Sequence, residues 1–293
     1  MRNPLHHDID TNDPDWMLVE AARGGDKAAL EQLIVVHQPW IYNIAFRMVM
    51  DNDDACDITQ EILIKIITNL ALYDPQKGAF RTWVYRIVVN YVLNMKKKKF
   101  EYRINDFDAF VAAIERFPDH SDYSHPEAAV LAEEVKTGCM LGMLLCLKRS
   151  ERIAFLLGGV FGVQDAVGAE IMEISRDNFR QMLSRARKKV RQYMHGTCGV
   201  INADNRCRCA HKVKAFSDLG MLDAQHLRYH KPLTRPVKAM IGVRLMDFQE
   251  TYYTLFLANF REQPFYDSPD VTVWLRKLLE TDAFKEIFNL DDQ

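Results

Sequence analysis

Apolar residues recur along the chain with the period of an amphipathic helix, and no convincing strand-like alternation accompanies them. The pattern is clearest at 57–70, 83–95 and 176–193, and weaker helical patterns cover 28–37, most of 128–194, 236–263 and 269–288. We therefore expect an all-α protein.

Breaks in this pattern divide the chain into four parts. Residues 101–127 carry Pro118, Pro126 and several aspartates, a composition typical of a linker. A second break at 195–211 brings glycines, cysteines and an Asn-Ala-Asp-Asn run. We expect a small helical domain at 14–100, the linker at 101–127, a second small helical domain at 128–194 and a mainly helical extension at 195–293.

The composition is that of an ordinary soluble globular protein, with 293 residues of which 48% are hydrophobic and 27% charged. Because the net charge is −2, any nucleic-acid surface must come from local basic clusters. No apolar run approaches the ~20 residues that a membrane helix needs, and the polar start does not look like a secretory signal. Six cysteines are too few for a disulfide scaffold. We expect a cytoplasmic protein without membrane contact.

The segment 57–70 has a core-facing arc and a polar arc when it is projected at ~100° per residue. Asp57, Gln60 and Glu61 share the polar arc, and Ile64 lies among them. This face is either an ordinary solvated surface with one apolar residue or a partner-binding patch. The core-facing arc consists of Ile58, Ile62, Leu63, Ile66, Ile67 and Leu70.

The segment 83–95 is apolar nearly all round, except for one stripe made by Arg86, Asn90 and Asn94, with Trp83 beside it. Four lysines, 96–99, follow directly. A buried helix with a cationic end is one interpretation. Four consecutive lysines exceed what the helix dipole needs, and cations beside aromatic rings suit phosphates beside unstacked bases. The pattern favours a nucleic-acid contact.

The segment 176–193 separates an apolar arc from a face that is almost wholly basic. Ser175 precedes it as a predicted N-cap, and a short helix with a tight turn, 165–174, precedes Ser175. A short helix, a turn and a basic helix form the helix-turn-helix pattern. A solvated basic helix is the alternative, but DNA phosphates would relieve the repulsion within so dense a positive face.

Three motifs in the sequence resemble those of a known family. Residues 54–62, DACDITQEI, resemble the core-binding helix of bacterial sigma-70 factors, and 80–90, FRTWVYRIVVN, resemble their promoter-melting segment. Residues 170–187 resemble the region 4 helix-turn-helix, although the usual turn glycine is absent from 172–174 and Phe179 replaces a valine. The small size resembles the extracytoplasmic-function (ECF) group, which keeps only regions 2 and 4, with a C-terminal extension added here.

The resemblance implies a promoter-specificity subunit of bacterial RNA polymerase, with core enzyme and promoter DNA as partners and an anti-sigma factor as a further candidate. Asp57, Gln60, Glu61 and Ile64 would contact the polymerase. The loop 73–79 would hold a flipped base. The minus-ten element would meet Trp83, Tyr85, Arg86, Asn90, Asn94, Lys96 and Lys97. The minus-35 element would meet Ser175, Arg176, Arg180, Gln181, Ser184, Arg185, Arg187 and Lys188.

Two other functions compete with this one. A stand-alone helix-turn-helix regulator would leave the Asp57 patch and the Trp83 stripe unexplained. An enzyme would need a catalytic constellation, and the sequence has no phosphate-binding glycine loop, nucleophile elbow or HExxH motif. We expect no enzyme activity and no required cofactor.

The extension carries the chain's one close Cys/His cluster, Cys198, Cys207, Cys209 and His211. Three thiolates and an imidazole can hold zinc, but the spacing lacks a CxxC knuckle, so buried structural cysteines are favoured over a zinc site. The two helical patterns beyond the cluster are rich in apolar residues. Since two helices alone make a thin core, we expect them to dock on region 2 or region 4 and to modulate activity in cis.

Overall fold

A computed structural model describes residues 4–5, 15–104, 106–121, 126–229, 236–237 and 254–281 of the chain. All regular elements in these ranges are helices, which confirms the predicted fold class, and residue pairing of the β type is confined to isolated bridges there. The α-helices are α1 Trp16–Arg23, α2 Lys27–Val49, α3 Asn52–Thr68, α4 Phe80–Asn94, α5 Lys99–Arg103, α6 Phe107–Glu115, α7 Ala128–Leu145, α8 Arg149–Ala154, α9 Asp165–Ile171, α10 Arg176–Thr197, α11 Cys209–Asp218, α13 Thr254–Glu262 and α14 Thr272–Leu279.

The predicted N-terminal domain, residues 14–100, contains helices α1–α4, which pack around α2. Asp26 caps α2 by accepting bonds from the amides of Ala28 and Ala29, and Asp51 caps α3 in the same way. The predicted apolar arc of α3 is buried against α2 and α4. Helix α4 ends at Asn94, so the lysines 96–99 follow the helix rather than extend it.

The predicted linker is more ordered than its composition suggested. It contains the short helix α6, which Asp106 caps, and α5 overlaps its start. Glu101 of α5 is buried and lies 2.7 Å from Arg149 Nη2 and 3.1 Å from Arg152 Nη1, both in α8. The linker therefore helps to join the two domains.

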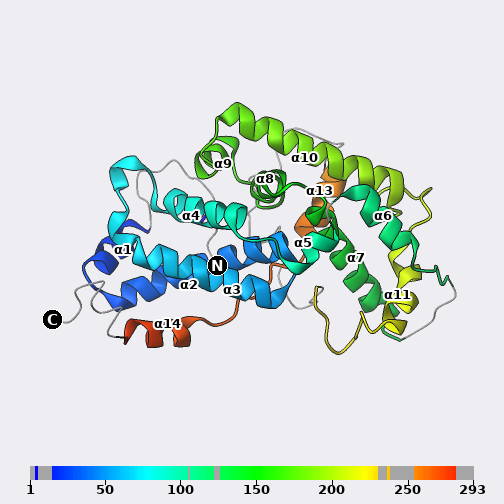
Figure 1. The fold of residues 1–293 in the computed structure, drawn as a ribbon, viewed down its shortest axis with the longest axis horizontal. Coiled ribbons are helices and arrows are strands. Elements are labelled where there is room, and N and C mark those ends of the chain that lie inside the picture. The colour runs from blue at the N-terminus through cyan, green and yellow to red at the C-terminus, as the bar shows by residue number, and fades with distance from the viewer. Residues whose placement is uncertain are drawn as a thin grey trace.

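The predicted second domain, residues 128–194, contains α7, α8, the π-helical turn η3 (Phe155–Val160), α9 and most of α10. Between α9 and α10, Glu173 has a φ of 54°, the left-handed conformation that the missing glycine would adopt easily. Ser175 caps α10 by accepting a bond from the amide of Asn178 at 3.2 Å, as predicted. Helix α10 runs along the upper edge of the molecule in Figure 1.

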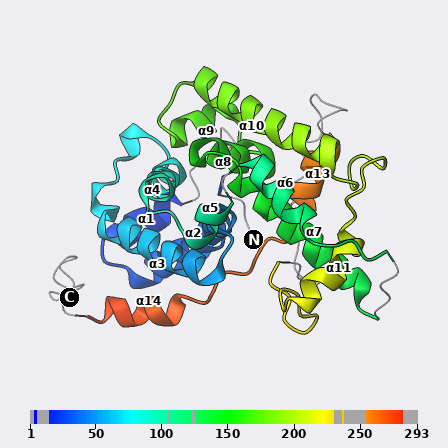
Figure 2. The same ribbon diagram turned by 45° about the vertical axis from the view of Figure 1, so that its right-hand side comes forward.

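The described part of the tail reaches both domains. Helix α13 packs on η3, and α14 packs on α2. Figure 2 shows α14 beside α2 and α3, on the side of the molecule away from α10. Buried apolar side chains of both domains and of the tail form one continuous cluster. The tail was expected on one domain and contacts both. Its predicted residues 238–253 and 282–288 lie outside the described ranges.

Candidate polymerase and promoter interfaces

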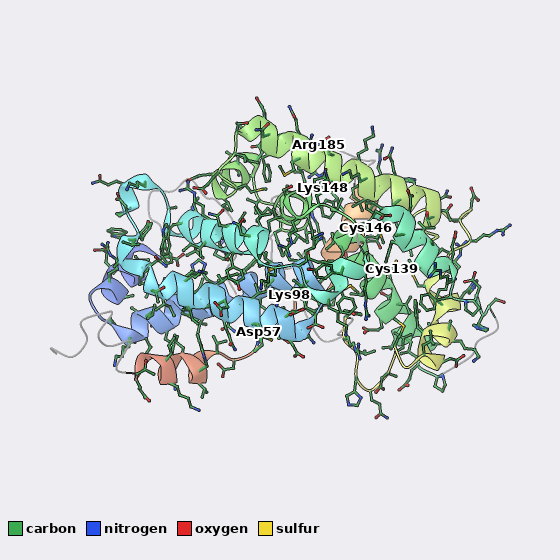
Figure 3. The ribbon with its side chains drawn as sticks, in the orientation of Figure 1. Asp57, Lys98, Cys139, Cys146, Lys148 and Arg185 are labelled. Carbon is green, nitrogen blue, oxygen red and sulfur yellow. The ribbon has the colours of Figure 1, made fainter. Side chains whose placement is uncertain are left out.

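The polar face of α3 is open. Asp57 and Glu61 are exposed, and Gln60 and Ile64 are half-buried beside them. Neither carboxylate has a hydrogen bond or an ion pair within the described part of the chain, whereas the neighbouring Asp54 pairs with Lys98 at 2.8 Å. The face thus presents two unneutralised charges next to an apolar side chain. Figure 3 shows Asp57 at the lower edge of α3.

An open groove of about 770 Å³ runs along the exposed side of α4. Its cations, amides and rings are the groups that bind phosphates and unstacked bases. Trp83 is half-buried, and its ring lies 5.6 Å from that of Phe80 and 5.7 Å from that of Tyr73. The groove is lined by Lys65, Asn69, Leu72, Trp83, Ile87, Asn90, Tyr91, Asn94, Met95, Lys96 and Lys98.

Tyr85 does not line this groove. It is 0% exposed, and its ring centroid lies 5.9 Å from that of His37 in the core. Because α4 is apolar nearly all round, its sequence could not show which aromatic residue faces outward. Burial makes Tyr85 a packing residue, so its predicted contact with DNA does not fit this structure.

Two residues of the polar stripe of α4 contact α9 and the turn that follows it. Arg86 Nε donates to the main-chain oxygen of Glu170 at 3.1 Å, and its Nη2 lies 3.6 Å from the Glu170 carboxylate. Asn90 Nδ2 donates to Glu173 at 3.3 Å. Asn94 and the lysines at 96 and 97 are exposed. Two residues of the predicted minus-ten stripe are therefore bound to acidic residues of the second domain.

The outer face of α10 carries a shallow hollow of about 440 Å³ lined by Arg180, Gln181, Ser184 and Arg185. Lys188 is also exposed. Arg176 and Arg180 both pair with Asp165 of α9, which lowers the pKa of that carboxyl group below its usual value, although burial alone would raise it. Ser175 is occupied as the helix cap. In Figure 3, Arg185 lies at the upper edge of the molecule, far from Asp57.

Arg187 does not share this outer face. It is half-buried, and its Nη2 donates to the main-chain oxygen of Gly158 in η3 at 3.4 Å. This contact holds α10 against η3. The predicted role of Arg187 at DNA is therefore not supported by its position.

Comparisons with known proteins show the family of this chain. Residues 33–100 match the model of sigma-70 region 2. The chain is 30% identical over 183 residues to the RNA polymerase sigma-H factor of Pseudomonas aeruginosa, covering 61% of this chain and 93% of that protein. It is 30% identical over 180 residues to the ECF RNA polymerase sigma-E factor of Escherichia coli K12, covering 60% and 92%. The chain belongs to the ECF group of the sigma-70 family.

This sigma factor is a promoter-specificity subunit of bacterial RNA polymerase and not an enzyme, and its partners are the core enzyme and promoter DNA. These relatives give no support to a stand-alone regulator. A solved structure of CnrH in complex with the cytosolic domain of CnrY is also similar, with 18% identity and a TM-score of 0.45 over 62% of this chain and 97% of that one. Within the described ranges, no helix is long and apolar enough to cross a membrane.

Two cysteines of the sigma factor's extension lie near Cys139, a residue that the sequence analysis did not connect with them. Cys139 of α7 lines a cavity of about 10 Å³ together with Cys198 and Cys209. Burial, with a smaller effect of neighbouring thiols, raises the pKa of Cys209 to about 12. Among the described residues, no group of three or more Cys, His, Asp and Glu side chains is arranged to hold a metal ion. Cys198, Cys207, Cys209 and His211, the less favoured zinc alternative, are not arranged as a ligand set within that part of the chain. Their sequence spacing could not reveal Cys139, which lies on a distant helix.

Proposed function

We propose that the open face of α3 is the surface by which this sigma factor binds core polymerase. The supporting observation is that Asp57 and Glu61 are exposed and unpaired beside Ile64, above a fully buried apolar arc. Two carboxylates around an apolar contact suit a basic partner surface with an apolar centre. Gln60 adds an amide at the same face.

We further propose that residues 14–100, which include the region 2 match, open and hold the minus-ten element in the groove along α4. Trp83 supplies a ring, Asn94 an amide, and the lysines at 96 and 97 supply charge for phosphate. Arg86 and Asn90 belong to this stripe, and in this structure they donate to Glu170 and Glu173.

For residues 128–194 we propose recognition of the minus-35 element by α10. Gln181, Ser184 and Arg185 surround the hollow on its outer face, where a helix in the major groove would meet base edges. Arg176, Arg180 and Lys188 flank them. Residues 101–127 would connect the two DNA-reading domains, and 195–293 would form the extension. The working compartment would be the cytoplasm, where promoter DNA and polymerase are found.

The core-binding assignment is tested by charge reversal. The double variant Asp57→Lys/Glu61→Lys should no longer co-purify with core enzyme, because both substitutions place cations on the docking face. Since both side chains are exposed, circular dichroism should show an unchanged fold. The matched control is Glu115→Lys on α6, which is exposed and far from α3. Wild-type recovery of core enzyme by the double variant would contradict the assignment.

A further inference from the structure

One carboxylate lies against the face of α10 that is proposed to read DNA. Asp165 is the first residue of α9, and Arg176 is the first residue of α10. Oδ1 of Asp165 accepts a hydrogen bond from Arg176 Nε at 2.8 Å, and Arg176 Nη2 lies 2.8 Å from the same oxygen. Oδ2 accepts a hydrogen bond from Arg180 Nε. Two guanidinium groups of α10 are therefore held by the two oxygens of a single acid.

The packing of α9 on α10 sets the position of Asp165 independently of these ion pairs. Phe179 of α10 is fully buried, and its ring lies against Gly168 of α9. A Cβ at Gly168 would lie 2.4 Å from the nearest ring atom, so the ring occupies the space that a larger residue would need. The two helices thus form a fixed frame that carries the carboxylate.

Stability does not explain why this acid is present. The side chains of Arg176 and Arg180 are 56% and 52% exposed, and ion pairs at such positions contribute little to folding. A negative charge beside a DNA-facing surface also repels phosphates, which weakens binding to every sequence alike. The effect that remains is on geometry, because Asp165 restricts the directions in which the two guanidinium groups can point.

The restriction leaves Arg180 in an arrangement suited to one base. With Nε bound to Asp165, the outer nitrogens Nη1 and Nη2 remain as a pair, and Arg180 lines the hollow on α10. Nη1 lies 3.8 Å from Asp177, which is longer than a hydrogen bond. Guanine presents two acceptors, O6 and N7, in the major groove, and a paired arginine contact to them is the commonest specific contact to DNA.

Arg176 has a different arrangement at the same acid. Its Nε and Nη2 both lie on Oδ1, so one edge of its guanidinium group is occupied and the carboxylate is kept from turning. Oδ2 is thereby left to Arg180. A guanidinium group that is already held loses less conformational freedom when it binds, which favours the one base that fits it.

We propose that Asp165 is a positioning residue for minus-35 recognition, which holds Arg180 with its outer nitrogens directed toward a guanine and so sets specificity at one base pair. The proposal rests on the proposed function of α10. Asp165 itself does not contact DNA. It weakens binding to all sequences and increases the preference for one of them.

The test uses the full chain assembled with core polymerase and a library of promoter duplexes in which the minus-35 region is randomised and the minus-ten region is constant. Sequencing of the bound DNA gives the base preference at each position. Arg180→Ala identifies the position that Arg180 reads. At that position, Asp165→Asn should reduce the preference for guanine about tenfold, while binding to unselected DNA should not fall.

Three further variants separate positioning from charge and from folding. Asp177→Asn removes the same charge from the same surface and should leave the guanine preference unchanged, because Asp177 is 3.8 Å from Arg180 and 85% exposed. Asp165→Glu keeps a carboxylate and should retain more of the preference than Asp165→Asn. Asp165→Asn/Arg180→Ala should lose no more than Arg180→Ala alone, since the two residues act as one unit. Thermal unfolding should show that each variant is folded.

The outcomes distinguish this inference from the function on which it rests. An unchanged guanine preference in Asp165→Asn, with a loss in Arg180→Ala, would overturn the role of Asp165 and leave that of α10 intact. An equal loss in Asp177→Asn would show an effect of charge and would also overturn positioning. Unchanged minus-35 preferences in Arg180→Ala, Gln181→Ala and Arg185→Ala would overturn the proposed function of α10 together with the inference.

Discussion

Arg47 in α2 and Pro264 in the tail are 217 residues apart in the chain, and the Arg47 Nη2 donates to the Pro264 main-chain oxygen at 2.7 Å. Burial lowers the pKa of Arg47 to about 10, which leaves the side chain charged at neutral pH. The bond therefore joins a buried cation near the start of the described chain to a main-chain dipole near its end.

Replacement of this cation should destabilise the protein. Arg47→Ala should lower the free energy of unfolding by about 3 kcal/mol, because it leaves a cavity and unpaired main-chain oxygens in the core. Denaturant unfolding followed by circular dichroism measures this. Arg103→Ala, at an exposed position on α5, is the control. Equal stability of the two variants would show that Arg47 is not a structural anchor.

The second prediction concerns pH and the linker. Burial alone would raise the pKa of Glu101, but the hydrogen bond from Arg149, with the Lys98 amide and the charge of Arg152, lowers it below the usual 4.5. A carboxyl group with a lowered pKa in the folded state stabilises the protein above its unfolded-state pKa, and that stabilisation is lost as pH falls through the folded-state value.

Glu101→Gln should therefore cost about 3 kcal/mol at neutral pH, because it leaves Arg152 buried without its anion. The variant should also lose less stability than the wild type when pH falls from about 5 to about 3. Denaturant unfolding at several pH values tests both statements. Parallel pH curves for the two proteins would exclude Glu101 as the responsible group.

Melting should depend on the groove along α4. Trp83→Ala should weaken open-complex formation by about 1–3 kcal/mol, because unstacked bases lose an aromatic surface, with less effect on closed-complex binding. Permanganate reactivity of promoter thymines reports the open complex. Since Trp83 also packs on Phe80, the thermal stability of the Trp83→Ala variant must be measured together with its open-complex formation. Asn94→Ala, at an exposed position, should reduce melting without that loss of stability, and wild-type footprints in both would count against the groove.

Promoter reading should differ among residues of α10. Gln181→Ala and Arg185→Ala should each cost about 1–3 kcal/mol at one base position and relax specificity there. Arg187→Ala should instead lower stability, because Arg187 bonds Gly158 rather than facing outward. Binding to a library of minus-35 sequences distinguishes them. A base-specific defect in the Arg187 variant would show that α10 lies on DNA with another face.

The period of apolar residues was sufficient to predict the buried and exposed faces of a helix wherever those two faces differ clearly in polarity. The arcs of α3 and α10, and the cap at Ser175, follow from the residue order alone, because side-chain position on an isolated helix depends only on its rotation per residue. In α4 the same method could not separate Tyr85 from Trp83, since apolar residues surround the helix. The helix α6 was not predicted, because its run of apolar residues is short and lies among aspartates and prolines.

Contacts between distant segments could not be predicted. Nothing near Cys139 indicates that cysteines some sixty positions later would share its cavity. The acceptor role of Pro264 is carried by main-chain oxygen, which every residue has, so no side-chain pattern marks it. Glu173 is an intermediate case, because the sequence showed a missing glycine at the turn but not that a glutamate would take the left-handed conformation and reach Asn90.

The position of residues 254–281 in the chain affects how the protein is made. A ribosome releases the N-terminal domain and the helix-turn-helix domain before it has synthesised the segment that ties them together. Bonds such as that between Arg47 and Pro264 close a loop of more than two hundred residues, and such long-range closure is slow compared with the folding of local helices. Each newly made molecule therefore passes through an interval in which Asn43 and Arg47 lack their main-chain partners at Pro264 and Tyr266.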